Sequence, residues 1–514
     1  MEKDLALQMQ GITKRFGGIL ANDHVDLDVY RGEILAVLGE NGCGKTTLMN
    51  MIAGIYYPDE GQILIDGNEV VIRSPKDAFD HKIGMVHQHF KLVDLFTAAE
   101  NVVLGMKEEG RYKLREVTEQ VAQITNRYGF RLDLTKKVYD LSVSEKQTVE
   151  IIKVLYRGAD ILILDEPTAV LTPQEITKLF DVLRRMKEDG KSIIIITHKL
   201  NEVLEVSDRV AILRRGKHIA TVNTAETSEA ELTEMMVGKK IDLNIERSTP
   251  IDPKPLLEIQ NLNLYNSEGI HVLKDINFTA NSGEILGVAG IAGSGQRELL
   301  EAIAGLQNVQ SGSIVFHDPE NGKTINFEDK TPLEIRQMGI HLSFVPEDRL
   351  GTGLVGNMDI TDNMMLRSYR KGRSGFLNRK DPRSQAEKIV SELQVVTPGL
   401  STLVRRLSGG NVQKVLVGRE IACAPRVLMA AYPVRGLDIN SSYTIYNLMN
   451  DQKVNGVAVI FVGEDLDVLL ALCDRILVIN SGAVTGIVDA RSVTKEEVGL
   501  LMTKTETERK EEAR

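Results

Sequence analysis

Residues 39–46 have the composition and spacing of a phosphate-binding loop. They read GENGCGKT, which matches GxxxxGK[ST], and they stand between the strand-like ILAVL and the helical TLMNMIAG. In such a loop the glycines turn successive backbone N–H groups toward phosphates, and the start of the following helix adds positive potential. Lys45 would reach the β and γ phosphates, and Thr46 would offer its hydroxyl to Mg²⁺. The segment therefore predicts a nucleoside triphosphate site.

Two adjacent acids, Asp165 and Glu166, end the apolar run in ILILDEP. A run of this length predicts a buried strand, so both carboxylates should lie at one edge of a sheet. There Asp165 can hold Mg²⁺ through water, while Glu166 polarises a water for attack on the terminal phosphate. Together with the loop, these acids predict a hydrolytic centre.

The loop belongs to a long segment that occurs twice. EILAVLGENGCGKTTLMNMIAGI from Glu33 returns as EILGVAGIAGSGQRELLEAIAGL from Glu284. A repeat this long is a whole domain rather than a solenoid unit, so the chain is predicted to be a tandem duplication. We expect domains at 1–240 and 256–503, a charged and proline-containing connector at 241–255, and a disordered polar tail at 504–514.

Each half is predicted to be an α/β domain with a mixed β core. Apolar runs such as 192–196 and 457–462 have the length of buried parallel strands, and each precedes a polar turn and a helical pattern. We expect parallel strands around the phosphate loop, an antiparallel edge from the N-terminal strands, and a helical subdomain.

The second copy of the loop keeps its glycines but loses the reactive groups. Gln296 and Arg297 replace the lysine and threonine, and Ala431 and Tyr432 replace the two acids when the sequences are aligned on the following proline. Loss of a general base alone lowers a rate by ~10²–10⁴. The second half is therefore predicted to support no useful turnover, although nucleotide could still bind there.

Composition limits the function classes. With 514 residues, 42% hydrophobic and 26% charged, the chain has the balance of a folded multidomain protein. A net charge of −10 disfavours generic nucleic-acid binding, and three cysteines without CxxC spacing disfavour structural zinc and favour a reducing compartment. No stretch approaches the ~18 apolar residues that cross a bilayer, so we expect membrane contact only through a partner.

Five motifs together resemble the ATPase subunits of ABC transporters. They are the loop, Gln88 in MVHQHF, LSGGN from Leu407, ILILDEP, and His198 in IIIITHKL. The resemblance covers nearly the whole chain. It implies two tandem P-loop NTPase (ABC ATPase) domains, each with a mixed β core and a helical subdomain, in a subunit that binds and hydrolyses ATP with Mg²⁺.

The resemblance also implies roles for the residues at matching positions. Catalytic roles fall to Glu166, His198 and Gln88, and contacts to the Mg²⁺ of Mg-ATP fall to Thr46, Gln88 and Asp165. Nucleotide contacts fall to Phe16, Gly39, Glu40, Asn41, Gly42, Cys43, Gly44, Lys45, Thr46, Thr47, Asp165, Ser408, Gly409, Gly410 and Asp438. Phe16 would stack on adenine, with a buried core phenylalanine as the alternative.

In this family each ATP lies between the loop of one domain and the LSGGQ-like signature of the other, which implies two composite sites. The first would join the intact loop and acids to Ser408, Gly409, Gly410 and the turn that ends in Asp438. The second would combine losses from both domains: Glu347 at the Gln88 position, Glu464 at the His198 position, Val143 and Ser144 at two signature glycines, and Thr172 at the turn aspartate. We expect hydrolysis at the first site alone.

One cysteine and two histidines lie in or beside these motifs, at positions where a reactive thiol and a metal site have to be considered. Cys43 lies in the loop near a helix start, where its pKa is predicted to fall and its thiolate to become reactive. His87 and His89 bracket Gln88 like a metal-binding pair, but no further ligands with structural-site spacing accompany them. We expect no metal at those histidines.

An importer is favoured because the chain has both ATPase domains and no membrane-spanning segment, whereas many exporters of this family fuse membrane-spanning segments to the ATPase. The resemblance implies two transmembrane permease subunits and a substrate-binding lipoprotein as partners, no nucleic acid, and a peripheral location on the cytoplasmic face of the cell membrane. By family analogy, residues 90–104 would transmit ATP-driven closure to the permease, with an ordinary surface helix as the alternative.

The substrate is inferred from resemblance alone. MVHQHFKLVD, ILILDEPTAVLTPQE, FVPEDR and AAYPVRGLD are most similar to the nucleoside-importing branch of the simple-sugar importers, with simple sugars or riboflavin as alternatives. A soluble ABC-type translation factor is the rival outside transport. Such factors usually keep both sites intact and join their halves by a long basic helical linker, neither of which this sequence has.

Overall fold

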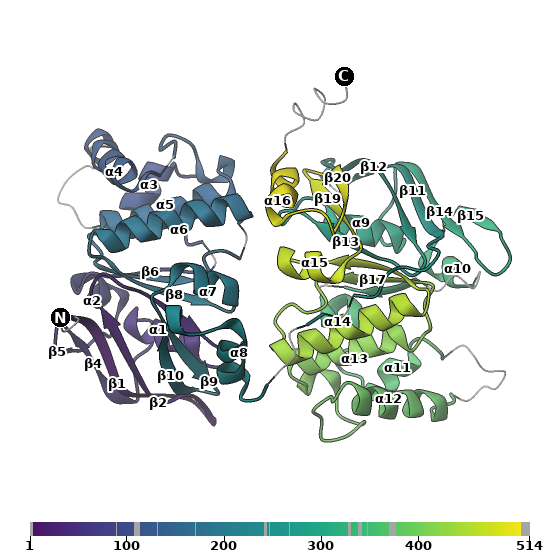
Figure 1. Ribbon diagram of the computed structural model, residues 1–514, viewed down its shortest axis with the longest axis horizontal. Helices are drawn as coiled ribbons and strands as arrows, with labels where there is room; N and C mark the ends of the chain where they lie inside the picture. The colour runs from purple at the N-terminus through teal and green to yellow at the C-terminus, as the bar shows by residue number, and fades with distance from the viewer. Residues whose placement is uncertain are drawn as a thin grey trace. The chain divides into compact units, whose positions relative to one another are not determined.

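The computed structural model describes residues 4–88, 90–106, 114–130, 132–169, 171–240, 244–245, 247–266, 268–326, 330–337, 342–346, 348–369 and 377–504. Its internal contacts divide the chain into two compact units, Met1–Asp242 and Leu243–Arg514 (Figure 1). Both units have the same order of strands and α-helices.

Unit 1 contains two sheets. The first is antiparallel, with strand order β2-β1-β4-β5. The second has the order β10-β9-β3-β8-β7-β6 and is parallel except for β10. The strands are β1 (Leu5–Phe16), β2 (Ile19–Tyr30), β3 (Ile34–Leu38), β4 (Glu60–Ile65), β5 (Asn68–Val70), β6 (Ile83–Val86), β7 (Ile161–Asp165), β8 (Ser192–Thr197), β9 (Arg209–Arg214) and β10 (Lys217–Asn223).

The strands β3, β7 and β8 are buried along their whole length, as continuous apolar runs in a covered parallel sheet should be. The helices of unit 1 are α1 (Lys45–Ile52), α2 (Pro75–Asp80), α3 (Ala98–Val103), α4 (Leu114–Tyr128), α5 (Val143–Tyr156), α6 (Pro173–Glu188), α7 (Leu200–Val206) and α8 (Glu229–Val237). A separate apolar core, which includes Val102, Val121 and Ile152, joins α3, α4 and α5 into the predicted helical subdomain.

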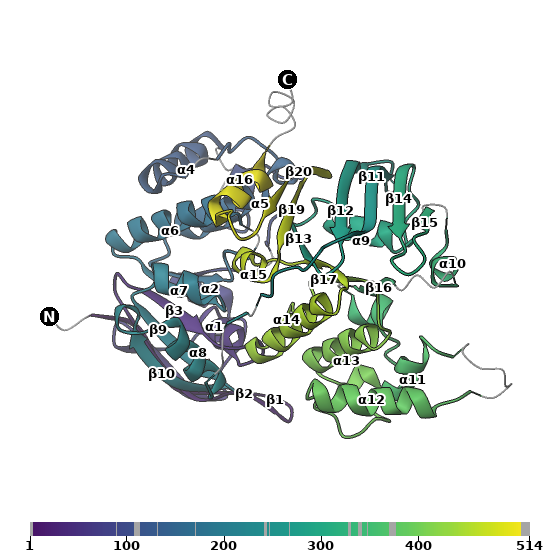
Figure 2. The same cartoon turned by 45° about the vertical axis from the view of Figure 1, so that its right-hand side comes forward.

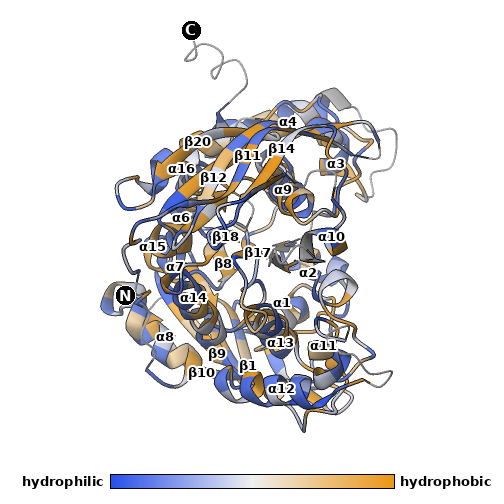
Figure 3. Ribbon diagram, turned by 90° about the vertical axis from the view of Figure 1, so that its right-hand side faces the viewer, coloured by the Kyte–Doolittle hydropathy of each residue, from blue (hydrophilic) through white to orange (hydrophobic). Residues whose placement is uncertain are grey.

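Unit 2 repeats this plan. Its sheets have the orders β12-β11-β14-β15 and β16-β17-β18-β13-β19-β20. The strands are β11 (Pro255–Tyr265), β12 (His271–Asn281), β13 (Ile285–Ala289), β14 (Ser311–His317), β15 (Thr324–Asn326), β16 (Leu342–Val345), β17 (Val427–Ala431), β18 (Ala458–Val462), β19 (Arg475–Asn480) and β20 (Ala483–Asp489). In Figure 3 hydrophobic residues are concentrated on the strands, and β13, β17 and β18 are buried throughout.

The helices of unit 2 are α9 (Gln296–Ile303), α10 (Pro332–Gln337), α11 (Ile360–Met365), α12 (Lys380–Glu392), α13 (Gly409–Ile421), α14 (Ile439–Val454), α15 (Leu466–Leu472) and α16 (Lys495–Thr503). Helices α11, α12 and α13 pack together (Figure 2) and correspond to α3, α4 and α5. Within the described parts of both units, no helix is long and apolar enough to span a bilayer.

Part of the predicted connector 241–255 lies on unit 2. Ile245 packs against its core, and Arg247 donates to the carbonyl oxygens of Leu470 and Cys473, at 2.9 and 2.6 Å. Strand β11 begins at Pro255, so the segment leads directly into the second domain. Of the predicted tail 504–514, residues 505–514 lie outside the described part of the chain.

Candidate nucleotide site

The loop between β3 and α1 requires its glycines. Gly42 and Gly44 have φ angles of 80° and 103°, in the region that favours glycine. A Cβ at Gly44 would lie 2.4 Å from the carbonyl oxygen of Ala21, and one at Gly39 would lie 2.3 Å from that of Leu213. The loop is therefore held tightly against the neighbouring backbone, and larger residues at these positions would displace it.

Lys45 lies along the inside of this loop. Its side chain is 5% exposed, and its ammonium donates to the carbonyl oxygens of Gly39 and Glu40, at 2.6 and 3.0 Å. The cation is thus fixed at the start of α1, where the helix N-terminus already favours anions. A loop of this shape and charge can accept phosphate groups.

Three neighbouring parallel strands place the other reactive side chains. Because β6, β7 and β8 end at the same edge of the sheet, Gln88, Glu166 and His198 meet there. Gln88 Nε2 donates to Glu166 Oε2 at 2.7 Å, and His198 Nδ1 lies 3.0 Å from Glu166 Oε1. Glu166 has a left-handed φ of 46°, and its N–H donates to the carbonyl of Ile196 at 2.9 Å. The carboxylate is therefore oriented by two side chains and a fixed backbone.

The two acids titrate differently. Burial raises the pKa of Asp165 to about 6, and the charge of Glu166 adds to the rise; Lys45 and a hydrogen bond with Thr46 oppose it. The hydrogen bond with His198 holds the pKa of Glu166 below its usual range. Pairs of groups whose pKa values are pushed apart are typical of catalytic sites. Thr46 and Asp165 also bring two oxygen donors together, a set that suits Mg²⁺ bound to substrate phosphates.

Residues 22–169 and 273–433 each match the sequence model of a protein family, the ABC transporter family. The chain belongs to the ABC transporter family. Each match begins in the second strand of a unit (β2 or β12) and includes the loop between β3 and α1, or β13 and α9. The chain is therefore an ABC ATP-binding subunit with two tandem ABC domains, and the fold class predicted from the sequence is confirmed.

Relatives match along nearly the whole ABC ATPase chain. Nucleoside import ATP-binding protein NupA of Lactococcus lactis is 41% identical, over 98% of this chain and 99% of its own. Guanosine import ATP-binding protein NupO of Bacillus subtilis is 42% identical, over 97% of each chain. Glucose import ATP-binding protein TsgD13 of Haloferax volcanii is 40% identical, over 98% of this chain and 96% of its own. Such ABC subunits are ATPases.

In this ABC ATPase, replacing Asp165 by asparagine is expected to stabilise the nucleotide-free and Mg²⁺-free chain at neutral pH. The raised pKa, about 6 against an ordinary value near 4, means that ionised Asp165 destabilises the fold by up to about 3 kcal/mol. An unfolded aspartate titrates near pH 4, so the gain should be complete above about pH 6 and vanish below about pH 4. Calorimetric unfolding of the full-length chain and its Asp165→Asn variant between pH 4 and 8 measures this gain in stability. A gain that does not depend on pH would contradict the raised pKa of Asp165.

Phe16, at the end of β1, is 41% exposed and is not the core phenylalanine of the alternative interpretation. Its ring edge packs against Tyr56 with centroids 5.1 Å apart and an interplanar angle of 72°, and Lys14 Nζ lies 5.7 Å from its centroid. An aromatic ring that is fixed on one side and open on the other can stack on a base.

The predicted fall in the pKa of Cys43 was wrong. The Cys43 side chain is 5% exposed, and burial raises the pKa of its thiol more than the nearby Lys45 charge lowers it. A thiol in this environment stays protonated at neutral pH. Burial also lowers the pKa of His87, which favours its neutral form, and His89 lies outside the described residues.

The second ABC loop retains the shape of the first without its charge. Gly293 and Gly295 have φ angles of 84° and 107°. Gln296 is 2% exposed, and its Nε2 donates to the carbonyl of Ile291 at 3.1 Å, the counterpart of the Lys45 bond to Glu40. Arg297 pairs with Glu301 one helical turn further along, at 2.7 Å. The loop backbone is preserved although its cation is gone.

The end of β17 is preserved in the same way. Tyr432 has a φ of 48° and donates its N–H to the carbonyl of Val462 at 2.9 Å, as Glu166 does to Ile196. Glu464, at the His198 position, pairs with Arg435 at 3.3 Å. Glu347 lies outside the described residues. Unit 2 therefore has the backbone of the site without its acids.

The signature of unit 2 lies at an open helix start. Ser408 precedes α13, and Gly409 and Gly410 begin its first turn, which contains no acidic residue. The Ser408 side chain caps none of the backbone N–H groups, and no other described side chain accepts from them. Ser408 Oγ accepts a hydrogen bond from Asn411 at 2.9 Å. Asp438 caps the next long helix, α14, by accepting from the N–H and hydroxyl of Ser441, at 2.8 and 2.6 Å.

The corresponding start of α5 in unit 1 is capped by the carboxylate of Glu145, which lies in the first turn of the same helix. Ser142 and Glu145 form a capping box: the Ser142 N–H donates to Glu145 Oε2 at 2.8 Å, and the Glu145 N–H donates to Ser142 Oγ at 3.2 Å. Sequence reasoning found the lost glycines but missed Glu145, although the S-x-x-E spacing is the signal for this box. Thr172, at the turn-aspartate position, caps α6 in the same way with Glu175.

Proposed function

We propose that this ABC subunit hydrolyses ATP on unit 1 and drives import of nucleosides. The observation that supports this most directly is the convergence of Gln88 and His198 on Glu166 at the edge where Asp165 also lies, in the same unit as the Lys45 loop. Unit 2 has an alanine and a tyrosine at the two acid positions. Relatives named for nucleoside and guanosine import support the substrate, and those named for glucose or ribose import make simple sugars the alternative.

We assign the chemical steps to the residues of unit 1. The loop amides and Lys45 hold the phosphates, and Phe16 stacks on adenine. Thr46, Gln88 and Asp165 would hold the Mg²⁺ that accompanies ATP, and this ion would supply positive charge to the phosphates. Glu166 is ionised at neutral pH because its pKa is lowered, so it can accept a proton from the attacking water. His198 orients that carboxylate.

The proposal includes a composite site. ATP on the unit 1 loop would meet Ser408, Gly409, Gly410 and Asp438 of unit 2. The open first turn of α13 supports this role because its N–H groups can donate to a γ-phosphate. At α5 the Glu145 carboxylate would repel the same anion. Losses in the loop of unit 2 and in the signature of unit 1 thus affect one and the same second site.

The proposed partners are two transmembrane permease subunits and a substrate-binding lipoprotein, with the chain on the cytoplasmic face of the cell membrane. Gentle solubilisation of native membranes, followed by purification of the tagged chain and identification of its partners, tests this directly. Multi-span permeases with a nucleoside-binding lipoprotein support the proposal, and a sugar-binding lipoprotein favours the alternative substrate. Ribosomal proteins without permeases would favour a translation factor instead.

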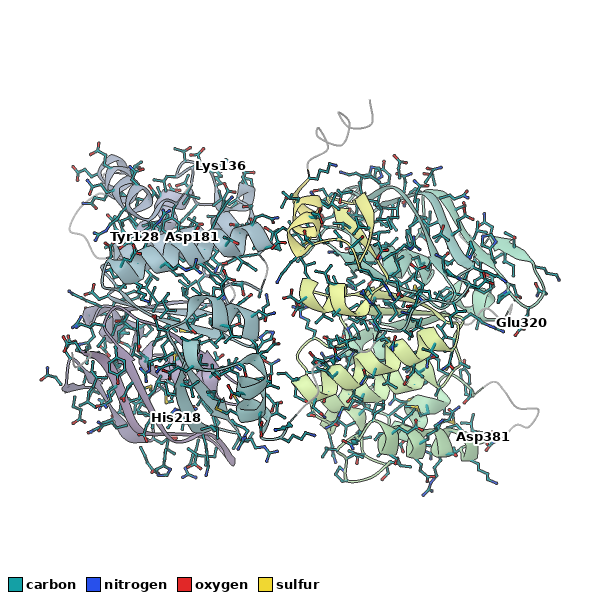
Figure 4. All side chains as sticks on the ribbon, viewed as in Figure 1. Tyr128, Lys136, Asp181, His218, Glu320 and Asp381 are labelled. Atoms are coloured by element: carbon teal, nitrogen blue, oxygen red, sulfur yellow. The ribbon has the colours of Figure 1, made fainter. Side chains whose placement is uncertain are left out.

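A charge reversal at Asp94 is expected to reduce transport several-fold while leaving the ATPase activity of the free chain intact. Val93, Leu95 and Phe96 are exposed around it, with Leu95 at 73%, as a surface that receives a permease helix should be. The matched control is Asp181→Lys on α6 (Figure 4), because Asp181 is also exposed and paired with one cation. Uptake in cells measures the effect, and equal uptake by the two variants would count against this surface.

A further inference from the structure

We propose that Arg349 is a positioning residue for ATP hydrolysis, because its guanidinium fixes the signature turn of α13 against the turn that leads to Asp438. The inference rests on the composite site proposed above. It assigns to Arg349 the task of setting the geometry of the groups that unit 2 would present to the γ-phosphate.

Arg349 is placed by a short helical turn of its own. Asp348 caps η3 (Arg349–Gly353) by accepting from the backbone N–H groups of Leu350 and Gly351, at 3.3 and 2.8 Å. This turn follows β16, which pairs in parallel with β17. The arginine therefore begins from the rigid edge of the central sheet, beside the strand that corresponds to β7.

The two ends of the guanidinium hold two separate turns. Arg349 Nη1 donates to the carbonyl of Gly409 at 3.3 Å, and Arg349 Nη2 donates to the carbonyl of Arg435. Gly409 is the first residue of α13, and Arg435 lies in the turn that runs through Gly436 to Asp438. One planar fork thus links the signature to the cap of α14, a geometry that a single ammonium cannot reproduce.

The Arg349 guanidinium packs closely against the two turns that it joins. A Cβ at Gly409 would lie 3.0 Å from Arg349 Nη1, and the nearest heavy atom to a Cβ at Gly436 would be Arg349 Nη2 at 3.8 Å. The guanidinium therefore lies over the glycine turn. The missing side chain of Gly409 leaves room for it, whereas a Cβ at Gly436 would make only an ordinary contact. Unit 1 has Phe90 at the corresponding position of MVHQHF, so the arginine accompanies the intact signature alone.

The electrostatics are consistent with a group held for an anion outside unit 2. Burial and the neighbouring Arg435 both lower the pKa of Arg349, and no described carboxylate forms an ion pair with it. Arginine nevertheless remains charged in proteins. A half-buried cation beside an open helix start adds to the positive potential that would meet a phosphate.

Three full-length variants, purified with the permease, test this inference. Arg349→Lys keeps the charge but not the fork, and kcat is expected to fall roughly tenfold; Arg349→Ala should lose ~10–100-fold. Binding of a fluorescent ATP analogue should change by less than about twofold, since the unit 1 loop holds the phosphates and Arg349 bonds, among the described residues, only to backbone carbonyls of unit 2. Arg383→Ala, which removes an exposed arginine on α12, should leave kcat and the melting temperature unchanged.

A fourth variant separates this inference from the composite site. Gly410→Asp adds a carboxylate to the signature turn at little steric cost, because its Cβ would meet only Leu437, at 3.5 Å. If Gly410→Asp is inactive while Arg349→Lys behaves like Arg383→Ala, the positioning role is overturned and the composite site stands. If Gly410→Asp is fully active, the composite site fails and the inference fails with it. A fall in kcat of Arg349→Lys that only follows a loss of folded protein would also overturn it.

Discussion

Glu166→Gln is expected to abolish ATP turnover while leaving ATP binding within about twofold of the original. Glutamine has the same shape and can keep the contacts with Gln88 and His198, which lie 2.7 and 3.0 Å from the carboxylate oxygens. It cannot accept a proton from water, and loss of a general base typically lowers a rate by ~10²–10⁴. The lowered pKa of Glu166 means that the ionised base is the form present at neutral pH.

Single-turnover hydrolysis and equilibrium ATP binding, measured on the same preparation, separate chemistry from affinity. The matched control is Tyr432→Phe, because Tyr432 occupies the equivalent position of unit 2 with nearly the same φ, 48° against 46°. We expect the control to hydrolyse ATP normally. Comparable losses in both variants would show that the two units share the chemistry, contrary to the proposal.

Lys45→Gln is expected to reduce kcat/KM by at least ~10²–10³, the effect of removing one preorganised group that stabilises developing charge. The substitution reproduces the residue of the second loop, where Gln296 keeps the backbone shape with a bond to the Ile291 carbonyl at 3.1 Å. The loop should therefore stay folded, and the loss should come from the missing cation. Unlike Glu166→Gln, this variant should also bind ATP more weakly.

ATP titration by calorimetry, together with steady-state hydrolysis, measures both effects. Gln296→Met is the control, since it replaces a buried amide in the second loop by an apolar side chain of similar size. It should leave turnover mostly intact. If the Lys45→Gln variant hydrolyses ATP at the same rate as the Gln296→Met variant, Lys45 has no role in the mechanism.

The elements around the site were predictable because their sequence signals are local. Apolar runs at 192–196 and 457–462 correspond to β8 and β18, which are buried along their length and pair in parallel. The order of parallel strands then brings Gln88, Glu166 and His198 to one edge. The sequence identified these residues by their motifs, and the structure shows that Gln88 and His198 each form a hydrogen bond with Glu166.

What the sequence could not predict depends on burial and on contacts between distant segments. The pKa of Cys43 was predicted to fall because of the helix start, but its degree of burial follows from the packing of the whole loop. The contacts of Arg349 join segments more than 50 residues apart, at separations of 60 and 86 residues. Glu145 differs, because its capping spacing was visible in the sequence and only its conflict with a phosphate needed the structure.

The different starts of α5 and α13 determine where local order depends on nucleotide. In α5 the first turn is complete in the free chain, because Ser142 and Glu145 satisfy each other. In α13 the first turn begins with Gly409 and Gly410. Arg349 holds it through the Gly409 carbonyl, but no described side chain caps its N–H groups, and glycine loses more backbone freedom on ordering than any other residue. Any further ordering when a phosphate binds should therefore fall on the N–H side of this glycine turn, while α5 keeps the same order throughout the cycle.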